Sequence, residues 1–184
     1  MSTTEAATIL AQKPGVDAIW RAVAAVPDPE IPVISVVDLG IIRDVEWRND
    51  EWVISVTPTY SGCPATEVIA ADIGRALIAA GVAKFRIETR LAPPWTTDWI
   101  APGARKRLAD YGIAPPSERG AAPGSSIRID ISALRRNLAD QAPVACPRCH
   151  SLRTREQSRY GSTPCKAQYR CDECLEPFDY FKPH

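Results

Sequence analysis

Four cysteines near the C-terminal end restrict what this chain can fold into more than any other feature of its sequence. They form two Cys-x-x-Cys pairs, Cys146 with Cys149 and Cys171 with Cys174, and 21 residues separate the pairs. Two such turns can deliver four thiolates to the corners of a tetrahedron, which suits Zn²⁺ with Zn–S bonds of about 2.3 Å. Tetrahedral sulfur also suits iron, so iron or an iron–sulfur cluster is the alternative metal.

The segment that carries these pairs, residues 143–184, needs a metal in order to fold. It holds few large apolar side chains, and fewer than about 40 residues rarely sustain a core unaided. Structural zinc can supply roughly 10–16 kcal/mol of apparent free energy. Glycine usually follows the second cysteine of such a pair, where φ is positive, but here His150 and Leu175 take that place, each at a cost of about 1 kcal/mol. His150 is an alternative ligand, although its position next to Cys149 makes that awkward.

The charge and hydropathy of the chain exclude some classes of function. The 22 basic and 22 acidic residues give no net charge, so nothing draws the whole chain toward nucleic acid or anionic lipid. Residues 143–184 hold seven Arg or Lys against five Asp or Glu, an excess too small for a typical nucleic-acid ribbon. The N-terminal sequence lacks a secretory signal, and no apolar run reaches the roughly 18–20 residues of a membrane helix. We therefore expect a cytoplasmic protein, whose spaced cysteines serve metal or redox chemistry rather than disulfides.

Hydrophobic periodicity predicts the fold of the remaining chain. The predicted elements are, in order, a helix over residues 16–26, strands near 40–47 and 51–57, a helix over about 64–80 and a strand over 84–91. This order indicates an α+β fold class, in which a small α/β layer domain (helix, hairpin, helix, strand) precedes a zinc-ribbon-like metal domain. A further short helix is predicted over 102–111, and Pro115 to Ser126 is typical of a linker. We divide the chain into an α/β domain over 14–92, a helix and linker over 93–142, and a ribbon over 143–184.

Cys63 is the candidate functional thiol outside the ribbon. It precedes Pro64, which suits the first position of a helix, so we expect Cys63 at the N-cap, where the helix dipole favours a thiolate. Asp28, Glu30 and Asp38 belong to a proline-constrained loop that we expect near this thiol. The alternative is that Cys63 is buried or capping without chemistry. A thiol-dependent enzyme is disfavoured because both histidines lie in the ribbon, which leaves no evident general base.

Two further groups of ribbon residues allow more than one interpretation. Cys165 is either a spare buried thiol or a reactive or auxiliary ligand group, and the sequence does not decide between them. The aromatic side chains of Phe178, Tyr180 and Phe181 either lie exposed as anchors for a partner protein or fill the small core of the ribbon.

Several motifs resemble a known family. Asp28-Pro-Glu-Ile-Pro-Val33, Asp38-Leu-Gly40 and Thr57-Pro-Thr-Tyr-Ser-Gly-Cys-Pro-Ala65 resemble the small α/β domain of iron–sulfur assembly factors of the SufT kind. The ribbon is similar to that of one branch, the PaaD family of D subunits associated with phenylacetyl-CoA epoxidase. That second resemblance is carried by Cys146-Pro-Arg-Cys149, Gly161-Ser-Thr-Pro-Cys-Lys-Ala167, Tyr169-Arg-Cys171 and Glu176-Pro-Phe-Asp-Tyr-Phe-Lys182.

The resemblance implies an accessory role in phenylacetate catabolism. The partners would be the oxygenase or reductase subunits of the epoxidase, and Cys63 would transiently hold iron or a cluster while their metal centres mature. The alternative is a structural binding subunit with purely structural zinc. The chain shows neither a glycine-rich dinucleotide loop nor the carboxylate–histidine helices of a di-iron enzyme, so we do not expect it to be an enzyme by itself. The identity of the metal, the client subunit and the oligomeric state, including a homo-oligomer, stay open.

Overall fold

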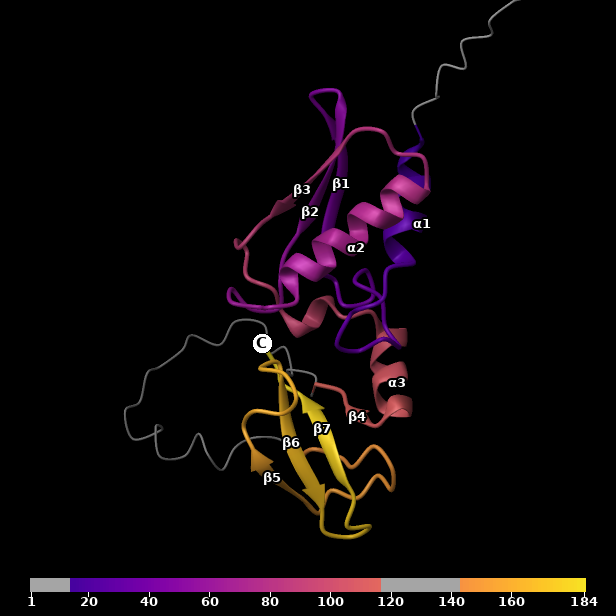
Figure 1. Cartoon of the computed structure of the whole chain (residues 1–184). Helices are drawn as coiled ribbons and strands as arrows, with labels where there is room; N and C mark the ends of the chain where they lie inside the picture. Colours follow the sequence, from indigo (N-terminus) through magenta and orange to yellow (C-terminus); the bar gives the residue numbers. More distant parts are fainter. Residues whose placement is uncertain (1–13, 117–142) are drawn as a thin grey trace, which may run out of the picture.

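The computed structural model describes residues 14–116 and 143–184 (Figure 1). Most of the predicted linker therefore lies outside the described residues, and the division of the chain at residues 92 and 142 stays a prediction. No helix in the described parts of the chain is long and apolar enough to cross a membrane.

The N-terminal part has the predicted order of helix, hairpin, helix and strand. Its elements are α1 (Val16–Ala24), β1 (Ile42–Arg48), β2 (Glu51–Val56), α2 (Thr66–Ala79) and β3 (Phe85–Thr89). Strand β2 is central, antiparallel to β1 and parallel to β3. Helices α1 and α2 contact each other, and α2 crosses the strands in Figure 1. The expected α/β layer is thus confirmed.

Local sequence explains where these elements turn and end. Asn49 and Asp50 join β1 to β2 with φ of 53° and 63°, the left-handed conformation that two-residue hairpin turns require. Helix α2 is followed by Gly81, whose φ of 77° suits a helix C-terminus. The buried side of α2 consists of Ile69, Ile73 and Leu77, which pack into the main core.

A connecting region follows the first sheet. It contains a short 3₁₀ turn, η1 (Thr97–Trp99), and the predicted short helix, α3 (Pro102–Tyr111). Proline at the start of α3 and Gly112 after it, with φ of 97°, fix both ends of this helix. The chain then forms a two-residue strand, β4 (Ile113–Ala114).

The ribbon forms a second sheet, and this short strand is part of it. Its own strands are β5 (Thr154–Ser158), β6 (Lys166–Cys171) and β7 (Pro177–Phe181), and the strand order is β4-β7-β6-β5. Strand β4 pairs in parallel with β7, while β5, β6 and β7 pair antiparallel. The segment after α3 is therefore built directly into the ribbon sheet.

The two sheets also share a hydrophobic core. Phe181 is 1% exposed and packs with Trp95, their ring centroids 6.0 Å apart, in the cluster that contains the core of the first sheet. Phe178 and Tyr180 are buried in a second cluster inside the ribbon. Of the two interpretations of these aromatics, exposure as partner anchors is wrong. Phe178 and Tyr180 fill the core of the ribbon, and Phe181 joins the core of the first sheet.

Candidate functional site

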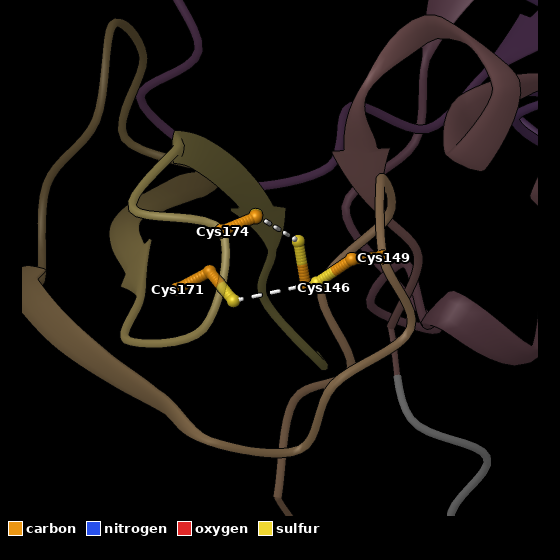
Figure 2. Close-up of side chains that lie close together, drawn as sticks. All are labelled: Cys146, Cys149, Cys171 and Cys174. Atoms are coloured by element: carbon orange, nitrogen blue, oxygen red, sulfur yellow. Dashed lines mark hydrogen bonds between the residues drawn. The ribbon is translucent and has the colours of Figure 1, made fainter.

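The four paired cysteines come together at one end of the ribbon (Figure 2). Their sulfur atoms all lie within 4.8 Å of one another. The sulfurs of Cys146 and Cys174 are 3.7 Å apart, and those of Cys149 and Cys171 are 3.5 Å apart. Four sulfurs bound at about 2.3 Å to a central tetrahedral ion would lie roughly 3.8 Å from each other. The four thiols thus fit one metal ion, and His150 is not part of the group.

Two tight turns present these thiols. The backbone N–H of His150 donates to the carbonyl of Cys146 at 2.9 Å, and the N–H of Glu173 points at the Cys171 sulfur at 3.4 Å. Each turn is followed by a residue of positive φ, 59° at His150 and 65° at Leu175. The sequence predicted positive φ at both positions, and the structure confirms it.

Cys63 lies in a turn before α2 and not at its cap. The helix begins at Thr66, and Ala65 occupies the N-cap. The Cys63 carbonyl accepts hydrogen bonds from the Thr66 backbone N–H at 3.2 Å and from the Thr66 hydroxyl at 2.8 Å. Pro64 belongs to this turn, and the helix begins only after it. The expected N-cap position of Cys63 is therefore wrong. The thiol is half-buried and lines a cavity at the start of α2.

The proline-constrained loop contributes two carboxyl groups to that cavity, Asp28 and Glu30. One oxygen of Asp28 accepts hydrogen bonds from the backbone N–H groups of Glu30 at 2.9 Å and Ile31 at 2.8 Å, which fixes the loop. Burial raises the pKa of Asp28 above its ordinary value, against the opposing effect of these bonds. Burial and the neighbouring Asp28 likewise raise the pKa of Glu30.

Asp38, the third acidic residue of the loop, has a different place. It does not line the cavity, and its carboxylate pairs with Arg107 of α3 at 2.6 Å. The same carboxylate accepts hydrogen bonds from the Ser35 backbone N–H and hydroxyl, both at 2.9 Å. Burial alone would raise the pKa of Asp38, but these donors and Arg107 hold it below its ordinary value. Asp38 therefore ties the loop to α3.

Cys165 is the residue whose position the sequence left undecided. It precedes β6, is 5% exposed and lines the same cavity as Cys63. Its sulfur lies 3.0 Å from the Thr163 hydroxyl oxygen and donates toward the Glu30 carboxylate at 3.9 Å. Burial, together with Glu30, raises the pKa of the Cys165 thiol to about 11. The motif Gly161 to Ala167 identified Cys165 as a residue of interest, but no sequence pattern predicts its contact with Glu30.

Family models match both parts of the chain. Residues 16–85 match the model described as an iron–sulfur cluster assembly protein. Residues 132–182 match the model described as the PaaD zinc beta ribbon domain.

Individual proteins are similar to the whole chain or to about half of it. An Escherichia coli (strain K12) protein, named as the D subunit of 1,2-phenylacetyl-CoA epoxidase, is 46% identical over 169 residues, which cover 92% of this chain and 93% of that protein. The Fe-S protein maturation auxiliary factor YitW of Bacillus subtilis (strain 168) is 34% identical over 92 residues, or 49% of this chain and 89% of that protein. A crystal structure of a domain of unknown function, DUF59, from Bacillus anthracis is 28% identical, with a TM-score of 0.46, and covers 50% of this chain and 89% of its own.

Proposed function

This chain belongs to the PaaD family, the D subunits of phenylacetyl-CoA epoxidase, and from that premise we propose that it matures or maintains the metal centres of that epoxidase. In this role it is an accessory component of phenylacetate catabolism without a catalytic reaction of its own. Its clients are the oxygenase or the reductase subunits, whose centres need iron.

One observation carries this proposal. The Cys63 thiol lies in a cavity lined also by Asp28 and Glu30, within the part of the chain that matches the iron–sulfur assembly model. Thiolate and carboxylate groups both bind iron, and a half-buried thiol can reach a partner protein. The 34% identity to a maturation auxiliary factor over 92 residues supports this role.

In this proposal iron is the cargo of the Cys63 site. When the Cys63 sulfur binds ferrous iron, the thiol releases its proton, and the sulfur regains a proton when the iron leaves for the client. Because the thiol is half-buried, this proton can pass to and from solvent. The reversible thiol bond keeps the cargo transferable.

The ribbon holds a different, resident metal, which we propose to be Zn²⁺. Cys146, Cys149, Cys171 and Cys174 would bind it, and the spacing of their sulfurs fits that ion. A bound zinc supplies folding free energy and no redox chemistry. The ribbon then keeps Phe181 of β7 and Cys165, which precedes β6, in the core around Trp95.

The metal content of the epoxidase tests the proposed function. The oxygenase and reductase are purified from cells that carry wild-type chain, Cys63→Ser, or a deletion, and iron and acid-labile sulfide are measured per complex. We expect full occupancy with the wild type and clearly reduced occupancy with Cys63→Ser and the deletion. Ser61→Ala, an exposed residue of the same turn, is the matched control and should behave as wild type. Full metal content in an inactive complex from deletion cells would instead show a structural binding subunit.

A further inference from the structure

The ribbon brings a second thiol to the cavity of Cys63. We propose that Cys63, Cys165 and Glu30 form a composite site for a single thiophilic divalent ion, such as ferrous iron, between the α/β part and the ribbon. This inference rests on the proposed function and deepens it, because it assigns the other ligands that hold the cargo. It also gives the ribbon a role in the site itself.

Cys165 makes polar contacts at the boundary between the two parts of the chain. Its sulfur is buried and faces Glu30, a residue 135 positions away in the sequence, at 3.9 Å from the nearer carboxylate oxygen. The backbone carbonyl of Cys165 accepts a hydrogen bond from the N–H of Lys182 at 3.0 Å, which ties it to the end of β7. A spare core thiol would be surrounded by apolar groups, whereas this one meets a carboxylate.

The size of the cavity decides what it can hold. Its volume is about 20 Å³. A cavity needs roughly 10–15 Å³ to hold one water molecule, so this one has room for one group of that size. A single ion fits this volume, and a multi-iron cluster does not. We therefore assign the site to one ion.

The charges around the cavity suit a bound cation with ionised ligands. Two thiols release two protons when they bind the ion, and the Glu30 carboxylate binds in its ionised form. Lys166, 4% exposed, carries a positive charge close to Asp28 and Glu30, while its ammonium group pairs with Asp179 at 3.2 Å. This ammonium offsets part of the negative charge that the ligands bring together.

Cobalt titration of the full chain tests the composite site. The ribbon is first loaded with zinc, which binds such sites more tightly than cobalt and so remains in place. Cobalt(II) is then added under reducing, oxygen-free conditions, and the sulfur-to-cobalt charge-transfer absorption is recorded. The wild type should bind one cobalt. Cys63→Ser and Cys165→Ser should each lose half of the absorption and bind at least about tenfold more weakly. In a competition titration, a molar excess of ferrous iron should displace the cobalt, because iron binds such sites more weakly than cobalt.

Controls separate ligands from folding defects. Every variant must retain one zinc and the far-ultraviolet circular dichroism of the wild type. Glu30→Gln should weaken binding while the charge-transfer intensity stays unchanged, and Glu67→Gln, an exposed carboxyl of α2, should change neither.

The outcomes also distinguish this inference from the proposed function. Should Cys165→Ser bind cobalt with the affinity and absorption of the wild type, the composite site is wrong, although Cys63 can still deliver iron. Should the cobalt site behave as described while Cys63→Ser leaves the epoxidase with full iron, the site stands and the maturation role fails.

Discussion

His150 and Leu175 are two non-glycine residues of the ribbon that have an unfavourable backbone conformation. Both have positive φ immediately after a Cys-x-x-Cys turn, where a side chain costs about 1 kcal/mol relative to glycine. Leu175 is 61% exposed, so its side chain gains little packing in return. The geometry of the metal turn therefore outweighs local backbone preference at these positions.

A substitution at Leu175 tests this balance. Leu175→Gly should tighten zinc binding by about fivefold, the equivalent of about 1 kcal/mol, because glycine accepts positive φ without strain. Competition with a colorimetric chelator measures the apparent zinc affinity. Leu152→Gly is the matched control, since Leu152 is 58% exposed and has no positive φ. Equal or weaker zinc binding by Leu175→Gly would show that the turn is not strained.

The loop between α1 and β1 is the element that positions the carboxyl groups. Its prolines predicted a non-helical backbone, and hydrogen bonds to Asp28 and Asp38 fix its two ends. Gly40 closes the loop with φ of 69°, and a Cβ there would lie 2.6 Å from the backbone oxygen of Trp99. The loop thus rests directly on the segment before α3.

Asp38 should make the stability of this loop depend on pH. Its pKa is lowered in the folded state, so its contribution is present above the unfolded pKa of about 3.9 and is lost as pH falls through the folded pKa. Asp38→Asn should reduce the free energy of unfolding at pH 7 by about 1 kcal/mol. This difference should vanish at low pH in urea unfolding curves. Asp110→Asn, at an exposed ion pair, should change little, and a pH-independent effect of Asp38→Asn would contradict the ion-pair account.

The sequence predicted some elements well because their signals are local. Proline and glycine fix both ends of α3, and alternation fixes β3. The start of α2 was misplaced because Pro64 is equally suited to the turn that precedes the helix. Contacts between distant segments, such as Cys165 with Glu30, leave no periodic pattern. The composite site and the packing of Phe181 in the core of the first sheet could therefore not be predicted.

At the scale of the whole molecule, the ribbon forms one wall of the cavity. Strand β4 joins its sheet, while Phe181 and Cys165 enter the core of the first sheet. Any loss of the ribbon metal should therefore remove Cys165 from the cavity as well.

Loss of a metal ligand tests this dependence. Cys174→Ser should abolish zinc binding and leave residues 143–184 sensitive to protease, because metal binding supplies most of the folding free energy of so small a unit. Residues 14–92 should remain protected, since they keep their own sheet and helices. Limited proteolysis with mass spectrometry identifies the cleavage sites, and Cys165→Ser is the control that retains zinc. Stoichiometric zinc in a protected Cys174→Ser ribbon would overturn the ligand assignment.

Transfer of iron is the measurement that tests the central claim most directly. The zinc-loaded chain is charged with ⁵⁷Fe(II) without oxygen and mixed with metal-depleted oxygenase or reductase in the presence of a chelator that captures free iron. The account predicts that the wild-type chain delivers ⁵⁷Fe to the client, detected by Mössbauer spectroscopy, while Cys63→Ser delivers none above the chelator background. Equal delivery by the wild type and Cys63→Ser, or no delivery by either, would contradict it.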